Sequence, residues 1–511
     1  MRTLLVFGLL TLACAPLGAQ KSLLFTGRFP HVSLDDVNER AGGSISKLEE
    51  FDITMITPGA SAVARTFWLP TTTMQTVMGD AYNDANYTRF NGIKTYFERW
   101  NFAAPFVKVA DQANCTWDKV YWTVRDNAVN KNFTVKTTNG TATAVIQPGD
   151  FFKFTKNGNV DYFITQTLIM KAAGVQSGVH VKGASAICQD AAGNLYYSPA
   201  EGGHYVTANT GNPVYQYDGS IIMIRAQDIT YDAFGNVQDV VADSAFVIFA
   251  EVLNGNPTVR QMMTNSQALT RDGNAIATSA NMVGLALDPN GGTVTAAVPW
   301  GTGQIYEVVP NFIWTDDNGG FAGTIFSSRV NPNNNLQGSV AVINGVTMGS
   351  LTVAANGSYL GVKLDYANFQ PTLMGLAVID TPANPPFLAD APNHGAILST
   401  DVNIDWDFYA GPGALVAAVL SVGPTTANQV PFGIDASALL LGDSFRCIYG
   451  LTTQVASFVV GVANPGGYAN LQLPKPTQGG LTGLSLILHG VKFTSTPLGF
   501  AISNPVISQF K

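Results

Sequence analysis

The stretch ASAICQDAAGNLYYSP (residues 184–199) decides the fold, because two β-prone runs flank an Asp-x-x-Gly-Asn cluster. Such a cluster suits a hairpin turn: the Asp side chain bonds backbone N–H groups that follow it, and Gly adopts the positive φ of a tight turn. The same order of apolar run, Asp or Asn, Gly and second apolar run recurs in residues 151–165, 227–242, 284–299 and 350–365. The sequence therefore predicts a chain of β-hairpins.

The rest of the chain predicts a mainly β fold with few short helices. Strand-like runs of about five to eight residues alternate with Gly, Asn, Asp and Pro turns, and helices are expected only at residues 74–78, 92–100 and 168–173. A β-propeller has blades of about 40–45 residues, and the turn glycines recur at irregular intervals around that length. We expect a propeller-like central region, with stacked sandwiches as the open alternative.

The first twenty residues, MRTLLVFGLLTLACAPLGAQ, predict a secretory signal peptide (1–20). Arg2 supplies the positive start, an apolar run follows, and Ala19 suits cleavage. Cys14 leaves a lipoprotein open as an alternative, although Thr11-Leu12-Ala13 before it departs from a lipobox. Since no later apolar run approaches about 18 residues, we expect no transmembrane segment. The protein is expected to be exported and to reside in the periplasm, at the cell surface or outside the cell.

Three regions are expected after the signal peptide. Residues 21–165 form a β-rich region with short helices, and residues 166–383 form the hairpin-rich, propeller-like region. Four prolines in DTPANPPFLADAPN (380–393) then interrupt the strand pattern. The last region, residues 386–511, has the size of a typical domain and is expected to be a β-sandwich.

The charge of the chain argues against one class of partner, and its cysteine content argues against one class of fold. The net charge is −8 and no basic cluster occurs, so nucleic acid is not an expected partner. Charged residues make up only 12% of the chain, about half of the usual ~25%. Of the 4 cysteines, Cys14 lies in the predicted signal peptide, which leaves Cys115, Cys188 and Cys447. An odd number allows at most one bridge, so this is not a disulfide scaffold.

Two groups of motifs resemble large exported proteins of planctomycete-type bacteria. The first begins with FWLPTTTMQTVMGDAYNDANYTRFNGIKTYFE (67–98) and continues with YDGSIIMI, ITYDAFGNV, GLALDPNGGT and SVAVINGVTMGSL. The second, VPFGIDASALLLGDSFRCIYG through PLGFAISNPVISQF, resembles a β-rich module that recurs at the C-terminus of such proteins. The resemblance implies export and residence in the envelope or outside the cell, and it implies no reaction. The family's acidic loop is denser in Asp than residues 80–84 here, which puts an inherited calcium site in doubt.

Calcium is the most plausible ligand, because it takes oxygen ligands and exported β proteins meet it at high concentration. In STDVNIDWDFYAG (399–411), Asp401, Asn403, Asp405 and Asp407 alternate with apolar residues, so in a strand they share one face. Either solvent or a bound cation would offset the repulsion between the carboxylates. As a linear EF-hand loop the stretch fails, since Trp406 stands where Gly is required.

A second calcium candidate consists of Asp80 and Asp84 with Asn83 between them. The competing interpretation is a loop that caps the helix expected at residues 92–100. Asp316, Asp317 and Asn318 are interpreted as a turn.

Catalytic candidates are few. PAEGGHYV places Glu201 and His204 on a Gly-rich loop, where they could act as an acid/base pair, although an exposed loop is the more ordinary interpretation. Gly-x-Ser-x-Gly, His-Glu-x-x-His and P-loop motifs do not occur. Aromatic residues between 67 and 122 could bind glycans by stacking, but core filling is the more usual role of such residues.

Two functions follow from these features. The favoured one is an exported, non-catalytic envelope or extracellular protein with a structural, adhesive or ligand-binding role, with glycans or envelope components as partners. The alternative is a secreted hydrolase or lyase that acts on polysaccharide, its site built on β loops. Whether the chain is an enzyme is left undecided by the sequence, with a non-enzyme favoured.

Overall fold

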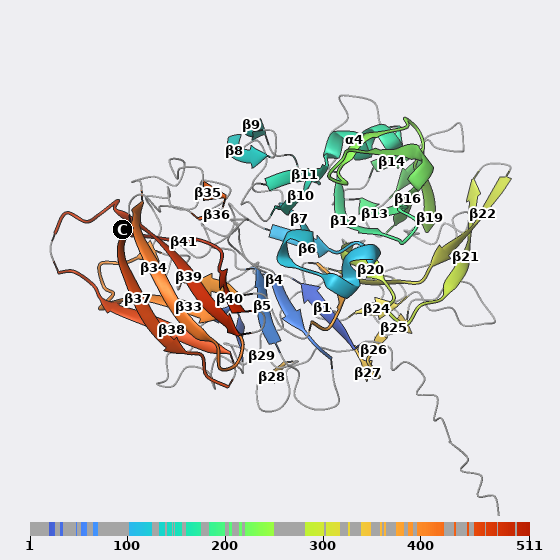
Figure 1. Ribbon diagram of the computed structural model, residues 1–511. Helices are drawn as coiled ribbons and strands as arrows, with labels where there is room; N and C mark the ends of the chain where they lie inside the picture. Colours follow the sequence, from blue (N-terminus) through green and yellow to red (C-terminus); the bar gives the residue numbers. More distant parts are fainter. Residues whose placement is uncertain are drawn as a thin grey trace, which may run out of the picture.

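The structure is a computed structural model. It describes the following residues: 20–25, 31–33, 47–48, 53–58, 65–69, 102–124, 132–137, 140–145, 147, 149–155, 160–174, 183–199, 204–206, 214–216, 220–249, 282–300, 303–316, 325–327, 339–348, 358–359, 362–363, 375–382, 387–391, 396–423, 434–435, 447–448, 454–465, 467–477, 479–495 and 498–510. Its ribbon is mainly β, with many antiparallel sheets and few short helices, as the sequence predicts (Figure 1).

Four of the four-stranded antiparallel sheets are built around the strands β6, β12, β20 and β30. We number the sheets along the chain by the strand at one end of each, β6, β12, β20 and β30, and call that strand the first strand of its sheet. Sheet one contains β6 (Phe102–Phe106), β7 (Tyr121–Val124), β10 (Phe151–Phe154) and β11 (Val160–Ile164). Sheet two contains β12 (Ala184–Gln189), β13 (Leu195–Pro199), β16 (Ile221–Ile224) and β19 (Phe246–Phe249). Sheet three contains β20 (Met282–Leu287), β23 (Phe312–Asp316), β24 (Phe326–Ser327) and β25 (Ser339–Val340). Sheet four contains β30 (Ala377–Asp380), β1 (Lys21–Phe25), β4 (Ile53–Ile56) and β5 (Arg65–Leu69).

The first strands of these four sheets meet at a common centre. Strand β12 contacts β6 and β20, while β30 contacts β20 and β6. The remaining strands of each sheet lead outward from this centre (Figure 1). Four sheets that radiate from adjacent first strands form a propeller-like ring.

Strand β1 closes the ring. It pairs antiparallel with β30, and Leu24 lies opposite Ala377. Side-chain bonds support the closure: Asn344 accepts from Lys21 N at 2.9 Å and donates to the carbonyl oxygens of Lys21 and Pro58. The sheet therefore joins a strand from the predicted 21–165 region to a strand from the predicted 166–383 region.

Smaller elements are inserted between these strands. Two-stranded hairpins are formed by β8 (Asn132–Thr137) with β9 (Gly140–Val145), β14 (His204–Val206) with β15 (Val214–Gln216), β17 (Ile229–Tyr231) with β18 (Val237–Val240), β21 (Thr293–Trp300) with β22 (Gly303–Pro310), and β26 (Val342–Ile343) with β27 (Val346–Thr347). Another sheet joins β28 (Ser358–Tyr359), β29 (Val362–Lys363), β2 (His31–Ser33) and β3 (Lys47–Leu48). Short 3-10 helices span η1 (Val109–Asn114), η2 (Trp117–Lys119) and η4 (Ala226–Asp228).

The helix expected at residues 168–173 is confirmed as α4 (Gln166–Ala173). Its N-cap, Thr165, accepts from Leu168 N, and Gly174 ends it in the left-handed conformation. Ile169, Ala172 and Ala173 are buried beneath it. The helices expected at 74–78 and 92–100 lie outside the described residues. Within the described part, no helix is long and apolar enough to cross a membrane.

The hairpin turn in the opening stretch is confirmed, and its geometry recurs. Asn194 N donates to Asp190 Oδ1 at 2.9 Å, and Gly193 has φ 89° and donates to Asp190 O. The turn Asp232–Asn236 repeats these bonds, with Asn236 N donating to Asp232 Oδ1 at 2.8 Å and Gly235 at φ 76°. Local chemistry therefore fixes both turns. The hairpin predicted at residues 284–299 is wrong, because β20 pairs with β23 and β21 pairs with β22.

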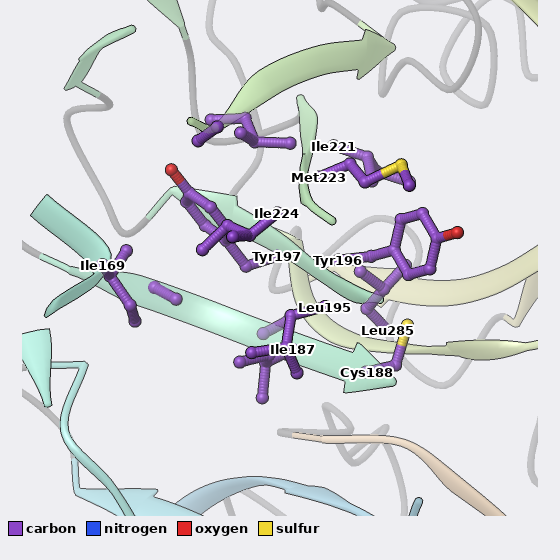
Figure 2. Packing of buried hydrophobic residues seen from close by; sticks show 14 of the residues in the cluster. Ile169, Ile187, Cys188, Leu195, Tyr196, Tyr197, Ile221, Met223, Ile224 and Leu285 are labelled. Atoms are coloured by element: carbon purple, nitrogen blue, oxygen red, sulfur yellow. The ribbon is translucent and has the colours of Figure 1, made fainter. Parts of the chain in front are cut away.

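Sheet two is buried on both faces, which explains its continuous apolar runs. Tyr196 and Tyr197, neighbours on β13, point to opposite sides of the sheet (Figure 2), and each is at most 1% exposed. On one side the Tyr196 ring meets Phe312 of sheet three edge-on, with 5.0 Å between ring centroids. Each fully buried large apolar side chain contributes about 1.5–3 kcal/mol, so contacts of this kind hold neighbouring sheets together.

The C-terminal part is a sandwich of two sheets (Figure 1). The smaller sheet contains β31 (Leu388–Asp390), β33 (Asn403–Tyr409) and β38 (Tyr468–Pro474). The larger contains β32 (Ala396–Ile397), β41 (Val506–Phe510), β39 (Ser485–Ser495), β34 (Leu415–Gly423) and β37 (Gln454–Val462), and β40 (Leu498–Ile502) also pairs with β39. A short pair, β35 (Ile434–Asp435) with β36 (Cys447–Ile448), occurs between β34 and β37 in the sequence.

One apolar core lies between these two sheets. It includes Trp406, Phe408, Val416 and Leu488, which are all fully buried. Trp406 Nε1 donates to Ser508 Oγ at 2.9 Å, which joins the smaller sheet to the larger. Strand β31 also contacts β5, so the sandwich touches sheet four of the ring.

Candidate functional site

Within the acidic stretch 399–411, residues 403–409 form β33 and alternate as predicted, whereas Asp401 and Val402 precede the strand and Val402 is exposed. Ile404, Trp406 and Phe408 point into the sandwich core. On the other face Asn403 is exposed, Asp405 is half-buried and Asp407 is buried. The burial of Asp407 departs from a fully solvated face and raises the question of what surrounds its charge.

Donors of the chain itself surround these carboxylates. Asp407 Oδ1 accepts from the Tyr468 hydroxyl and, at 2.8 Å, from Asn470 Nδ2. Asn470 also donates to Asp405, which in addition accepts weakly from Gln472 at 3.4 Å. Charge-assisted bonds of this kind stabilise a buried carboxylate. The polar face therefore has an internal hydrogen-bond network.

Asp401 lies apart from this network and shapes a turn. Its Oδ2 accepts from Leu398 N at 2.8 Å, and its own N–H donates to Leu398 O. Asp390 of β31, also buried, lies opposite Asp407 in the strand register. Among the described residues, no three Asp, Glu, His or Cys side chains are arranged to hold a metal ion. Calcium at this face stays a prediction.

The sequence reasoning missed Tyr468 and Asn470, the donors of this network. Both lie on β38, where Tyr468 pairs with Tyr409 and Asn470 with Asp407. A signal was present: YANLQLP (468–474) alternates polar and apolar residues as β33 does. Pairing the two alternating strands would have placed Asn470 beside Asp407.

Of the other predicted site residues, only His204 is among the residues that the structure describes. Asp80, Asp84 and Glu201 lie outside the described residues. His204 is the first residue of β14, and its backbone pairs with Gln216 of β15.

The β14–β15 hairpin leaves sheet two at a defined rim. It is inserted between β13 and β16, whose connection starts after Pro199 and ends before Ile221. Pro199 lies opposite Ala184, where the first strand β12 begins. In sheet one, β8–β9 is likewise inserted between β7 and β10. Each insertion therefore leaves its own sheet at the end where the first strand of that sheet begins, and we call these ends the entry rim.

Two lysines, Lys108 and Lys153, join sheet one to the β17–β18 hairpin, which is inserted between β16 and β19 of sheet two. Lys108 Nζ lies 4.7 Å from the centroid of Phe163, 5.2 Å from Tyr121 and 5.6 Å from Tyr231. The same nitrogen donates to Gly235 O at 2.9 Å, and Lys153 donates to Phe234 O at 2.9 Å. Burial, with a smaller contribution from Lys153, lowers the pKa of Lys108 to about 8. The two lysines fix the turn of the β17–β18 hairpin against sheet one.

Asp150 is a buried carboxyl at the start of α4. Its oxygens accept from Gln147 N at 2.8 Å and Gln166 N at 2.7 Å. Burial raises the pKa of Asp150 to about 6, although both backbone bonds act in the opposite direction. The carboxyl thus accepts from the first backbone N–H of α4 with a pKa of about 6, above the usual range for Asp.

Four aromatic residues of the N-terminal region fill the core. Phe106, Trp117, Tyr121 and Trp122 are each at most 4% exposed. The Phe106 and Tyr121 rings stack with 4.5 Å between centroids. These four rings are thus not part of a glycan-binding surface. Among the described cysteine side chains, Cys188 is a buried thiol.

Comparisons with known proteins give no family. No family model matches the chain, and no curated protein is significantly similar to it. Among solved structures, a mutant of Salmonella alpha-2-macroglobulin aligns at 10% identity and TM-score 0.16, covering 96% of this chain and 31% of that one. Red sea bream transglutaminase aligns at 11% identity and TM-score 0.13, covering 80% of this chain and 54% of that one. The chain thus spans less than two thirds of either protein, and likenesses this weak carry no argument about fold or function.

Proposed function

We propose that the protein is an exported, non-catalytic component of the envelope or extracellular space, with a structural, adhesive or ligand-binding role. The observation that carries the proposal is the use of acidic side chains as structural acceptors. Asp190 and Asp232 build turns, and Asp405 and Asp407 accept from Asn470. Side chains that chemistry would need free are here engaged in holding strands together.

Two sequence features support export. The predicted signal peptide ends at the residue before β1, the strand that closes the ring. The resemblance to exported proteins of planctomycete-type bacteria favours the same location. Glycans or envelope components are the proposed partners, and the insertions at the entry rim offer the surface for them.

A secreted hydrolase or lyase is the second candidate. The observation that favours it is the place of His204 at the start of β14, an insertion that leaves the entry rim. Under this alternative, Glu201→Gln and His204→Ala would each abolish release of sugars from polysaccharide. Equal activity of both variants and the wild type would remove these two residues from consideration.

Fractionation of the native host tests the proposal. The expected result is a chain that begins at residue 21 and stays with the envelope through salt and EDTA washes. A full-length chain in the cytoplasm would contradict export. Free release into the medium together with polysaccharide cleavage would favour the second candidate.

A further inference from the structure

An Asn-Gly pair forms the turn that holds β1, the strand that closes the ring. Asn344 and Gly345 connect β26 to β27, and both have a positive φ, 50° and 79°. The Asn344 side chain accepts from Lys21 N at 2.9 Å and donates to Lys21 O at 2.6 Å and to Pro58 O at 2.8 Å. Both the oxygen and the nitrogen of this amide therefore hold β1 in the ring.

An asparagine that precedes glycine can react with its own backbone, because glycine has no side chain to hinder the approach. The backbone nitrogen of Gly345 attacks Cγ of Asn344, the Cγ–Nδ2 bond breaks, and Nδ2 leaves as ammonia with the proton of the Gly345 N–H. Water then opens the resulting imide at either carbonyl and gives aspartate or isoaspartate. Gly345 is exposed, and a Cβ there would meet no atom within 4 Å, so water reaches this turn.

The contacts with β1 oppose this reaction. The leaving nitrogen is the atom that donates to Lys21 O and Pro58 O, so both bonds must break before ammonia departs. The carbonyl of the same amide accepts from Lys21 N, and this bond holds Cγ in place. Loss of the amide therefore requires a local opening in which β1 leaves the turn, and its rate follows the population of the opened state.

The product of the reaction cannot restore the contact. An ionised carboxylate accepts hydrogen bonds but donates none, so it would face the carbonyl oxygens of Lys21 and Pro58 without a proton to share. Isoaspartate also adds a methylene carbon to the backbone of the turn. A ring that opens and reacts is therefore hindered from closing again.

We propose that Asn344 is a deamidation site that ring closure protects. The amide persists while β1 pairs with β30, it reacts when β1 leaves the turn, and the resulting carboxylate keeps β1 from returning. The turn thus acts as a one-way covalent switch that converts a transient opening of the ring into a lasting one. The inference is independent of the proposed function.

The test is the rate at which residue 344 loses its amide in the full chain, followed by peptide mapping in mildly alkaline buffer. Leu24→Ala removes a fully buried side chain of β1 and is expected to raise this rate by at least about tenfold, because the strand loses its packing. Leu488→Ala is the matched control, since Leu488 is equally buried but lies in the sandwich core. This control is expected to leave the rate unchanged.

A synthetic peptide of residues 339–348 gives the rate of the open turn, and the wild-type protein is expected to react at least about tenfold more slowly than this peptide. The comparison holds even where Leu24→Ala does not fold. Equal rates for the peptide and the wild type would overturn the proposal, as would equal rates for Leu24→Ala and the wild type.

Asn344→Asp introduces the carboxylate directly and tests its effect on β1. Exchange of the β1 backbone amides is expected to rise in this variant at neutral pH. Asn290→Asp is its control, because Asn290 also precedes glycine but its side chain donates to Asp288 and to Val342 O rather than to β1. An Asn344→Asp protein whose β1 amides exchange as slowly as those of the wild type would contradict the one-way switch.

Discussion

Two turns with the same sequence pattern differ in what their Asp side chain holds. Asp190 accepts from Asn194 and also, through Oδ2 at 2.9 Å, from the hydroxyl of Tyr196, which is 1% exposed. Asp232 accepts only from residues of its own turn among the bonds described for it. Removal of Asp190 therefore leaves a buried hydroxyl without its acceptor, whereas removal of Asp232 affects a partly exposed turn.

We expect Asp190→Ala to lower the free energy of unfolding by about 2–4 kcal/mol, because a buried polar group loses its partner. Asp232→Ala is expected to cost about 1 kcal/mol, the loss of local bonds near solvent. Denaturant unfolding of both variants checks the difference. Asp190→Asn is the control, since its side-chain oxygen can still accept. Equal losses for the two Ala variants would contradict the role given to Tyr196.

The turns could be predicted from sequence because their determinants lie within five residues. Asp190 and Gly193 carry the capping bonds and the positive φ, and α4 is likewise defined by Thr165 and Gly174 at its ends. The surroundings of Asp407 could not be predicted with the same ease. Its donor Tyr468 lies 61 positions away, and only the register of β33 with β38 brings the two together.

At the scale of elements, one side chain anchors the strand that closes the ring. Asn344 lies in the β26–β27 turn at φ 50° and bonds to Lys21 N, Lys21 O and Pro58 O. We expect Asn344→Gly to cost about 2–3 kcal/mol, because three bonds are lost while glycine keeps the positive φ. Hydrogen exchange of the β1 amides should rise in this variant.

Gly345→Ala is the matched control for this change. Gly345 has φ 79°, and a Cβ there meets no atom within 4 Å. The substitution therefore strains the same turn without touching β1. If it accelerates exchange in β1 as much as Asn344→Gly does, the anchoring bonds have no special role.

The propeller-like ring was expected, but its blade period could not be read from the turn glycines. Gly193 lies between the first two strands of sheet two, whereas Gly235 lies in the inserted β17–β18 hairpin. Insertions such as β8–β9 and β21–β22 make the spacing between sheets irregular. The first strands of the four sheets therefore begin at residues 102, 184, 282 and 377. The pairing of β1 with β30 was also beyond local patterns, since more than 350 residues separate Lys21 from Asp380.

At the scale of the whole molecule, the ring and the sandwich should respond to pH in opposite directions. Burial raises the pKa of Asp150 to about 6 from 3.8, so between these values the folded ring binds more protons than the unfolded chain. Its stability contribution is therefore lost as the pH rises from about 4 to 6. His489 in β39 is 3% exposed, and burial lowers its pKa to about 4 from 6.5. Its stability contribution is lost as the pH falls from about 6.5 to 4.

We expect a change from pH 7 to pH 5 to stabilise the ring and to destabilise the sandwich, by about 1–2 kcal/mol from each group. Hydrogen exchange resolved by segment measures both parts in one sample. Asp150→Asn should remove the gain in the ring, and His489→Gln should remove the loss in the sandwich. Parallel changes in both parts, unaltered by these variants, would contradict the assignment.

The central claim is that the first strand after the predicted signal peptide closes a ring of four sheets. A disulfide between Lys21→Cys and Asp380→Cys tests it most directly, because these positions lie opposite each other in β1 and β30. Mild oxidation of the double variant should join the two peptides in high yield, as read by mass spectrometry, while Lys21→Cys with Lys171→Cys should give no such product. Absence of the 21–380 link under conditions in which the protein is folded would contradict the closed ring.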